Sequence, residues 1–453
     1  MDKIQLLQER KAKILEAGKE IRDQINELVD SQSFVELSTF SFSKNDFYGE
    51  DVAGEGVITG FATIDGNPFY IVAQNFKVLK GGISNANCEK IVKCLDAAEK
   101  QEVPVIYLLN TLGVQVGEGV TVLEGLAKLL VKSTQLKESV GQYVIVNGEV
   151  YGSAAILAAI ADFTFFLEGK SVLAINSPFV LSAKAGKNLA KEEVGGCNAI
   201  TKTGVGTLVV KDLSEAKAKI LAIDELLGNK LVDAELNESI PALNEKVDVE
   251  TLMSVFETAI ELGSSYESDV KTVLGRIGGI SVAAIVFDGG EDGVALTEGK
   301  LAKINDFLNC GFNLPLLVFG NVKGIDPSME TNNSRVMKRT AEYLQLINAR
   351  DLPKISVVYK KTVGLGYSLF AAKSTGFDYV CAFANACISL FDNVQGAQIE
   401  FSEEKADKAA LAAKYADENA DPINAAKNGY IDAIIEPQFV KQHVIASLQM
   451  LMQ

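Results

Sequence analysis

The feature that most constrains the fold is a repeat, in which the two halves of the chain carry the same succession of apolar runs and glycine turns. Pro104, inside one buried-type run, corresponds to Pro315 inside another, 211 positions later. Gly152, which opens a small-residue segment, corresponds to Gly364, 212 positions later. A nearly constant shift across separate landmarks favours a duplicated unit over a chance match of apolar runs.

Within each half, strand-like runs alternate with helix-like segments. The first half opens with an amphipathic helix over 4–29, and a β-hairpin follows that turns at Asp65-Gly66. Continuous apolar runs such as 103–109 are typical of buried parallel strands. The pattern predicts βαβ units, and therefore an α/β fold. The predicted strands are 56–64, 68–73, 103–109, 143–146 and 163–167, with helices over 87–100, 122–132 and 152–161.

The second half repeats this succession with predicted strands at 279–287, 313–319, 355–358 and 376–380, and a helix over 300–308. A polar stretch over 237–249 separates the two sets of elements. We therefore predict two domains, 1–245 and 246–453. A length of 453 residues with 48% hydrophobic residues allows both to have sizeable cores.

Charge and composition exclude several classes of function. The formal net charge of −16 repels a phosphate backbone, so nucleic-acid binding is not expected. His443 is the single histidine, so a Ser-His-Asp triad, a Cys-His dyad or a multi-His metal site would each depend on it. The six cysteines form no Cys-x-x-Cys pair, and we expect reduced thiols and no metal site. Chemistry must then use backbone groups, carboxylates, Lys, Tyr or a cofactor.

The sequence also predicts a cytoplasmic protein. It begins with a charged helix and has no apolar signal core at this end. The longest apolar stretch, 154–161, is too short to span a bilayer.

Two glycine turns, each between a strand and a helix, are candidates for chemistry. The first contains Gly152 and Ser153, and the second contains Gly364, Leu365 and Gly366. Glycine lets a ligand approach the backbone closely, and a helix start offers free N–H groups. Two such donors aimed at one oxygen would form an oxyanion hole. Tight turns that only pack helix against strand explain the same residues, and residue types alone do not separate the two readings.

Two further glycine-rich segments follow strands. One contains Gly113 and Val114, at the edge of a parallel sheet where α/β ligands bind. The other contains Gly81 and Gly82 beside Lys77 and Lys80, which suits CoA phosphates or a plain solvated loop. Met337-Lys338 resembles the biotinylated Met-Lys of carrier domains, but it lies in a predicted helix. Any biotin is therefore expected on another chain.

At these motifs the sequence resembles the biotin-dependent carboxyltransferases of acyl-CoA carboxylases and decarboxylases. The resemblance runs from about Ser33 to the C-terminus. Single motifs are weak, but their order and spacing follow the family. They are Ser33–Leu37, Gly54-Glu55-Gly56-Val57-Ile58-Thr59-Gly60, Gly81-Gly82, Val194-Gly195-Gly196-Cys197, Cys310-Gly311-Phe312-Asn313-Leu314-Pro315, and Pro422 to Asp432 with Ile435-Glu436-Pro437.

The resemblance implies tandem crotonase-like domains, each a ββα superhelix of the ClpP/crotonase type. It implies that a short-chain acyl-CoA thioester binds the first half and that biotin, on a separate carrier chain, binds the second. The thioester enolate would be held by Gly152 and Ser153, and the biotin ureido oxygen by Leu365 and Gly366. Substrate contacts are expected from Gly81, Gly82, Gly113, Val114 and Tyr367.

The implied partners are a biotin carboxyl carrier protein, and either a biotin carboxylase or a membrane decarboxylase subunit. A homo-oligomer, dimeric or hexameric, is also implied, because the two half-sites would face each other across subunits.

The chain departs from the family pattern in three of its motifs, and it also lacks the family's early Gly-Lys-Leu-Thr-Ala-Arg-Glu-Arg segment. The family's Ser-Gly-Gly-Ala-Arg is replaced by 111–115, so its arginine becomes Gln115. Its Gly-Gly pair is Gly152-Ser153, and its Tyr-Gly-Gly-Ala-Tyr is 363–367 with Leu365 in place of a glycine. Backbone donors survive such changes, since any residue but proline has an N–H. Two alternatives therefore remain beside a carboxyltransferase: a non-catalytic scaffold paralogue, and a crotonase-type acyl-CoA enzyme that needs no biotin.

Overall fold

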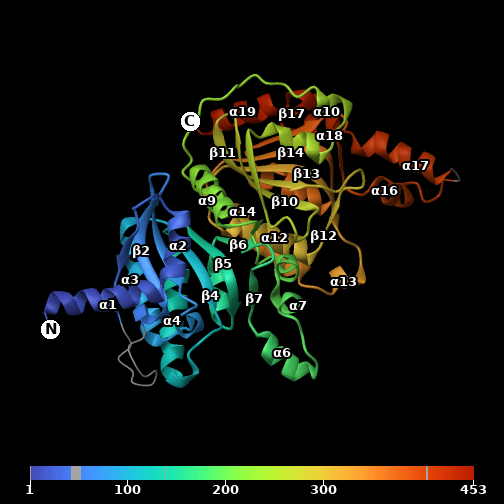
Figure 1. The fold of residues 1–453 in the computed structure, drawn as a ribbon. Coiled ribbons are helices and arrows are strands. Elements are labelled where there is room, and N and C mark those ends of the chain that lie inside the picture. Colours follow the sequence, from blue (N-terminus) through green and yellow to red (C-terminus); the bar gives the residue numbers. More distant parts are fainter. Residues whose placement is uncertain (1, 42–52, 138, 405–406, 453) are drawn as a thin grey trace. The chain divides into compact units, whose positions relative to one another are not determined.

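The computed structural model describes residues 2–41, 53–137, 139–404 and 407–452. It divides into two compact units, Met1–Ala222 and Ile223–Gln453, and each is described by itself (Figure 1). The division falls inside helix α9 (Leu213–Leu227), upstream of the polar stretch where we placed it from the sequence. Residues 223–245 belong to the second unit, where the Val232 N–H donates to the Gly279 carbonyl at 3.1 Å.

The first unit is built on one mixed sheet. Its strand order is β1-β2-β3-β4-β5-β6-β8, with β7 beside β5. The strands β1 to β3 are antiparallel neighbours, and β3 to β6 run parallel. The strands are β1 (Val35–Leu37), β2 (Val57–Ile64), β3 (Asn67–Gln74), β4 (Val105–Thr111), β5 (Gln142–Tyr151), β6 (Phe163–Leu167), β7 (Val172–Ala174) and β8 (Leu208–Val210).

The second unit repeats this topology. Its strand order is β9-β10-β11-β13-β14-β15-β17, with β12 beside β13 and β16 beside β14. The duplication predicted from the sequence is therefore confirmed at the level of strand order. The strands are β9 (Thr258–Leu262), β10 (Val270–Ile277), β11 (Ile280–Phe287), β12 (Val294–Leu296), β13 (Leu316–Ile325), β14 (Lys354–Val363), β15 (Tyr379–Phe383), β16 (Cys387–Ser389) and β17 (Ala433–Ile435).

Each unit contains an antiparallel hairpin, which was predicted from the sequence for the first half. Asp65 and Gly66 turn the first at φ 51° and 77°, and Gly278 and Gly279 turn the second at φ 57° and 75°. Two successive residues with positive φ suit the right-handed twist of the flanking strands. The hairpin places one long strand, β3 or β11, against the parallel part of its sheet.

Helices cover the sheet of the first unit and complete its core. Buried side chains of α3 and α4, such as Leu95 and Leu126, pack on Tyr107 and Val144 of the strands. The predicted N-terminal helix is interrupted at Gly18, giving α1 and α2. The helices are α1 (Lys3–Ala17), α2 (Lys19–Leu28), α3 (Asn85–Gln101), α4 (Val120–Leu136), α5 (Ala154–Ile160), α6 (Pro178–Ala185), α7 (Lys191–Gly195) and α8 (Cys197–Ile200).

In the second unit α12 takes the place that α3 has in the first. Both helices begin with a hydroxyl N-cap, Ser84 for α3 and Thr297 for α12. Met337 and Lys338 lie on α14, as predicted. The helices are α10 (Ala242–Glu245), α11 (Val249–Leu252), α12 (Glu298–Asn309), α13 (Met329–Asn332), α14 (Val336–Asn348), α15 (Leu365–Phe370), α16 (Asn393–Glu400), α17 (Lys408–Tyr415), α18 (Pro422–Lys427) and α19 (Val440–Leu451).

Candidate functional site

The two glycine turns occupy the same position in the two units. In the first unit β5 ends at Tyr151, and the chain enters α5 at Ala154. In the second, β14 ends at Val363 and α15 begins at Leu365. Both turns therefore lie at the carboxyl end of a central parallel strand, the edge where α/β folds bind ligands.

The leading glycine of each turn is required by its backbone conformation. Gly152 has a φ of 70° and Gly364 a φ of 54°. The Gly152 N–H donates to the Ala174 carbonyl in β7 at 3.1 Å, and the Gly364 N–H donates to the Ser389 carbonyl in β16 at 3.0 Å. The Gly152 N–H is already used, so the assignment of the first oxyanion hole to Gly152 does not fit this geometry.

The residues that follow carry N–H groups that remain free, as is usual at a helix start. Among the described residues, the backbone N–H groups of Ser153 and Ala154 have no acceptor, and neither do those of Leu365 and Gly366. A shift of 212 relates both pairs, the same shift that relates Gly152 to Gly364. In the second turn the Tyr367 N–H is a third group of this kind among the described residues. The sequence analysis did not predict Ala154, although a shift of 212 from the predicted Gly366 leads to it.

Leu365 and Gly366 fit their positions for different reasons. Leu365 opens α15, is not among the residues with positive φ, and is 49% exposed. A leucine therefore replaces the family glycine without backbone strain. A Cβ on Gly366 would lie 2.9 Å from both the carbonyl oxygen and Cγ1 of Val322, so a glycine is needed for close packing on β13.

The three other glycines predicted to contact substrate all have their N–H groups paired. Gly81 donates to the Val78 carbonyl at 2.9 Å and Gly82 to the Leu79 carbonyl at 3.0 Å. Gly113 donates to Thr111 Oγ1 at 3.1 Å. Among the described residues, the Val114 N–H has no acceptor. Of these four residues, Val114 is the one with a backbone donor to offer.

The structure nevertheless brings these segments together. The Ile83 N–H donates to the Gly113 carbonyl at 2.9 Å, which joins the 79–83 turn to the 111–115 loop. A Cβ on Gly81 would lie 2.1 Å from the Asn110 carbonyl oxygen. A Cβ on Gly113 would lie 3.6 Å from the Tyr151 carbonyl oxygen. The three loops that follow β3, β4 and β5 thus form one continuous edge.

Gln115, which stands where the family has arginine, supports this edge. Its Nε2 donates to the Leu79 carbonyl at 3.1 Å. The same nitrogen would lie 1.8 Å from a Cβ on Gly82, so it lies directly over that glycine. Gln115 therefore supports the turn through this hydrogen bond, and it lacks the positive charge of the family's arginine.

Burial raises the pKa of two titratable groups in the chain. Glu55 is 2% exposed, and burial raises the pKa of its carboxyl to about 7. Tyr367, the third residue of α15, is half-buried, and burial together with Tyr430 raises the pKa of its phenol.

His443 lies on α19, where its Nδ1 is 3.4 Å from the Tyr379 hydroxyl. In the described part of the chain, no group of three or more His, Cys, Asp or Glu is placed to hold a metal ion.

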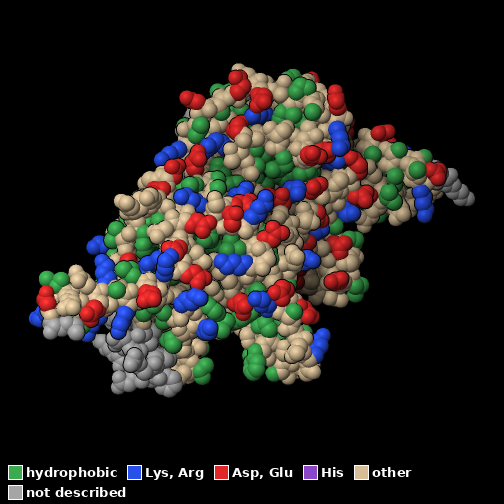
Figure 2. Space-filling view, viewed as in Figure 1, with side chains coloured by type: hydrophobic (Ala, Val, Ile, Leu, Met, Phe, Trp, Pro, Cys, Tyr) green, Lys and Arg blue, Asp and Glu red, His purple; other side chains and the backbone are tan. Residues whose placement is uncertain are grey.

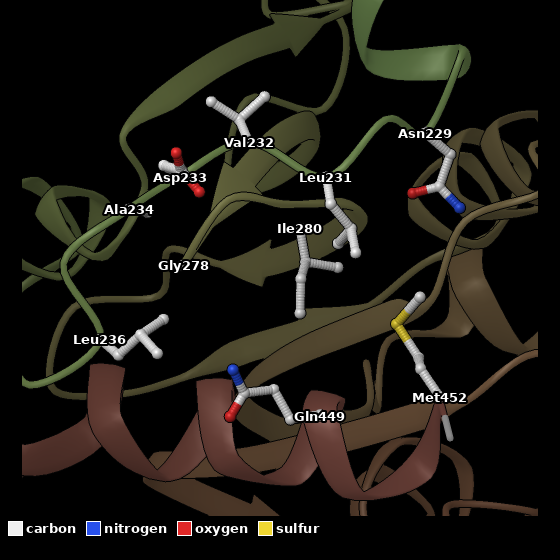
Figure 3. A pocket seen from close by; sticks show the side chains of 10 residues that line it. All are labelled: Asn229, Leu231, Val232, Asp233, Ala234, Leu236, Gly278, Ile280, Gln449 and Met452. Atoms are coloured by element: carbon white, nitrogen blue, oxygen red, sulfur yellow. The ribbon is translucent and has the colours of Figure 1, made fainter.

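Other surface features lie away from these turns. A pocket of about 720 Å³ in the second unit is lined by Leu231, Ile280 and Met452, among others, and contains no predicted site residue (Figure 3). On the face drawn in Figure 2, Lys and Arg side chains are interspersed with Asp and Glu and form no single basic track. No helix in the described ranges is both long and apolar enough to cross a membrane.

Comparison with known proteins gives a consistent result. The model of the carboxyl transferase domain matches residues 15–453. The chain is 28% identical to "Methylmalonyl-CoA decarboxylase subunit alpha" of Veillonella parvula, over 99% of this chain and 96% of that protein. It is 26% identical to "Propionyl-CoA carboxylase beta chain" of Saccharopolyspora erythraea, over 95% of this chain and 87% of that protein.

Solved structures share the fold. The hexameric transcarboxylase 12S subunit, solved with methylmalonyl-coenzyme A and methylmalonic acid bound, superposes with a TM-score of 0.91 at 23% identity. The match covers 99% of this chain and 94% of that one. The predicted fold class, tandem crotonase-like α/β domains, is thereby confirmed.

Proposed function

The chain belongs to the carboxyl transferase family, and on this premise we propose that it moves a carboxyl group between biotin on a carrier protein and a short-chain acyl-CoA. As a family member it is a carboxyltransferase of the kind found in biotin-dependent acyl-CoA carboxylases and decarboxylases. The observation that carries the proposal is that each unit has free N–H groups at the same turn of its sheet.

In the first unit, the Ser153 and Ala154 N–H groups would hold the thioester carbonyl oxygen. Charge gathers on this oxygen when the α-carbon gains or loses its carboxyl group, because an enolate forms. Fixed donors stabilise that charge without having to reorganise during the reaction. The hydrogen bond from the Gly152 N–H to the Ala174 carbonyl ties the turn to β7, which would help to hold the donors in place before the thioester arrives.

In the second unit, the Leu365 and Gly366 N–H groups would donate to the ureido oxygen of biotin. Biotin would be the group that accepts or releases the carboxyl group. The residues fit such a group: two free N–H donors lie beside the half-buried Tyr367 and the exposed apolar side chains of Leu365 and Leu390. Apolar side chains suit the carbon rings of biotin, and they exclude water that would hydrolyse a labile carboxyl group.

The two alternatives differ in what argues against them. Every helix start leaves N–H groups free, so the unpaired donors do not exclude a non-catalytic scaffold, and the activity test below decides that point. An acyl-CoA enzyme without biotin would need one site, whereas the duplicated turn offers two. The related decarboxylase and carboxylase subunits act with methylmalonyl-CoA and propionyl-CoA by name, which favours a thioester of this size.

We also propose that the chain assembles with copies of itself and with a biotin carrier. Large apolar side chains are exposed beside each turn, and such patches mark interaction surfaces. They are Leu112, Val116, Val120 and Leu123 in the first unit, and Leu365, Leu390 and Val394 in the second. A biotin carboxylase or a membrane decarboxylase subunit would complete the complex.

We expect a dimer or larger assembly in solution. Covering the exposed apolar side chains beside the two turns removes apolar surface from water, which favours association. Light scattering at micromolar concentration checks the mass, and a monomer of 48.6 kDa would contradict the proposal.

The activity test uses the purified chain with methylmalonyl-CoA or malonyl-CoA and free biotin. The expected result is loss of the thioester carboxyl group that depends on biotin. Turnover of the same rate without biotin would favour the biotin-independent alternative. No turnover with any short malonyl-type thioester would favour the scaffold.

A further inference from the structure

Each unit contains a buried lysine at the same place in the fold. Lys90 lies on α3 and is 2% exposed, and Lys303 lies on α12 and is 5% exposed. The two are 213 positions apart, as are the N-caps Ser84 and Thr297 of their helices. In the described residues, neither lysine forms an ion pair with a carboxylate.

Both lysines bind backbone carbonyls instead. Lys90 Nζ donates to the carbonyls of Val57 at 2.7 Å and Gly54 at 3.1 Å. Lys303 Nζ donates to the carbonyls of Tyr266 at 2.6 Å and Glu267 at 3.3 Å. In each unit these carbonyls lie where the chain enters the antiparallel hairpin: Gly54 is in the bend before β2 and Val57 is the first residue of β2, and Tyr266 and Glu267 are in the bend before β10.

Holding a charge there is costly. An ammonium group loses its hydration when it is buried, and backbone carbonyls replace only part of it. Burial accordingly lowers the pKa of each lysine to about 8. Glu36 and Glu55 oppose this shift at Lys90, and Arg22 adds to it; Glu261, Asp269 and Glu267 oppose it at Lys303, and Lys271 adds to it. An apolar side chain of similar size would avoid this cost.

In the first unit the bend packs against the 78–82 turn. Gly54, Glu55 and Gly56 all have positive φ, which turns successive carbonyls toward α3. Asn87, one helical turn before Lys90, donates to the Glu55 carbonyl at 2.9 Å. A Cβ on Gly56 would lie 3.3 Å from the Val78 carbonyl oxygen, so the bend packs against the turn formed by 78–82. The neighbouring Ile83 N–H is bonded to the Gly113 carbonyl, and Gly113 lies beside Tyr151, the residue before the donor turn.

In the second unit the bend is tied to β12. Lys300, one helical turn before Lys303, pairs with Asp269 at 2.6 Å and donates to the Ala295 carbonyl at 2.9 Å. β12 pairs with β13 at Val322, against which Gly366 packs. A short chain of contacts therefore leads from each buried lysine to the donor turn of its own unit.

We propose that Lys90 and Lys303 are positioning residues, each fixing the bend that supports the oxyanion donors of its own unit. The assignment of thioester and biotin to particular units rests on the proposed function. The duplication makes the idea testable, because two equivalent lysines should affect different substrates.

The test compares Lys90→Met and Lys303→Met, with Lys93→Met at an exposed position of α3 as control. In the biotin-dependent assay, Lys90→Met is expected to raise the KM for the acyl-CoA about tenfold and to leave the KM for biotin unchanged. Lys303→Met is expected to do the reverse, and Lys93→Met to change neither. A reversed pattern would support the positioning role and exchange the substrates of the two units. Equal effects of both variants on both constants, or no effect, would overturn the proposal.

A second measurement does not depend on turnover. Amide hydrogen exchange over 78–84 is expected to speed up in Lys90→Met and stay unchanged in Lys303→Met, and exchange over 294–296 is expected to respond the other way. Hydrogen exchange tests the positioning role even if the wild-type chain has no activity. Unchanged exchange in both segments would overturn the proposal. If a methionine variant does not fold, Lys90→Gln and Lys303→Gln keep a shorter donor and are expected to give smaller shifts in the same direction.

Discussion

Ser153→Pro is expected to lower the rate of biotin-dependent carboxyl loss by roughly 100- to 1000-fold, the usual effect of removing one oxyanion donor, or about 3–4 kcal/mol. Proline has no N–H, so the change deletes one of the two free donors in the first unit. Ser153 has a φ of −64°, which is the angle that proline imposes, and it lies at the start of α5, where helices accept proline. The turn should therefore keep its shape. The measurement is the rate at saturating thioester, taken beside the thermal midpoint.

Two neighbouring substitutions serve as controls for Ser153→Pro. Ser153→Ala keeps the N–H and is expected to keep near-full activity. Gly152→Ala keeps the Ser153 donor, and its Cβ would meet nothing within 4 Å, but it places a side chain at a φ of 70°. It is expected to cost about 1–2 kcal/mol of stability, with activity lost only as folded protein is lost. A well-folded Ser153→Pro enzyme with near-normal rate would remove this N–H from the site.

The repeat and many of its strands were predictable because they depend on long apolar runs. Pro104 and Pro315 directly precede the buried parallel strands β4 and β13. The turn at Asp65-Gly66 was equally clear, since few residue pairs accept two successive positive φ angles. These patterns involve residues that are adjacent in the sequence, so they can be recognised without knowledge of the tertiary structure.

The state of the Gly152 N–H could not be predicted in the same way. It is paired with Ala174 because β7, a strand of three residues, lies beside β5. A strand this short has too few residues to show an alternating pattern. The sequence therefore located the turn correctly and could not say which of its N–H groups tertiary structure would use.

The buried lysines escaped prediction for a related reason. Lys90 lies in a helix with several charged residues, where a lysine is ordinarily solvated. Its carbonyl partners are 33 and 36 residues away in the sequence, and they face it only because three positive φ angles turn them. Burial of this kind depends on the packed fold and leaves no periodic signal.

Leu365→Pro is the corresponding experiment in the second unit, and the expected loss is again roughly 100- to 1000-fold. Leu365 is the first residue of α15, the helical position that proline favours. Gly364 before it has a ψ of −124°, outside the α region that proline disfavours in its predecessor. The leucine side chain is 49% exposed, so little packing is lost and the thermal midpoint should hold.

The matched variants Leu365→Ala and Leu365→Gly separate the donor from the side chain. Both keep the N–H, so both should retain most of the activity if the donor is what matters. The departure from the family glycine is then neutral, as expected of a residue without positive φ. If Leu365→Ala loses as much activity as Leu365→Pro, the exposed side chain matters more than the N–H, and it acts by covering the ligand and excluding water. If Leu365→Pro folds normally and keeps its rate, the second unit's oxyanion site is not at this turn.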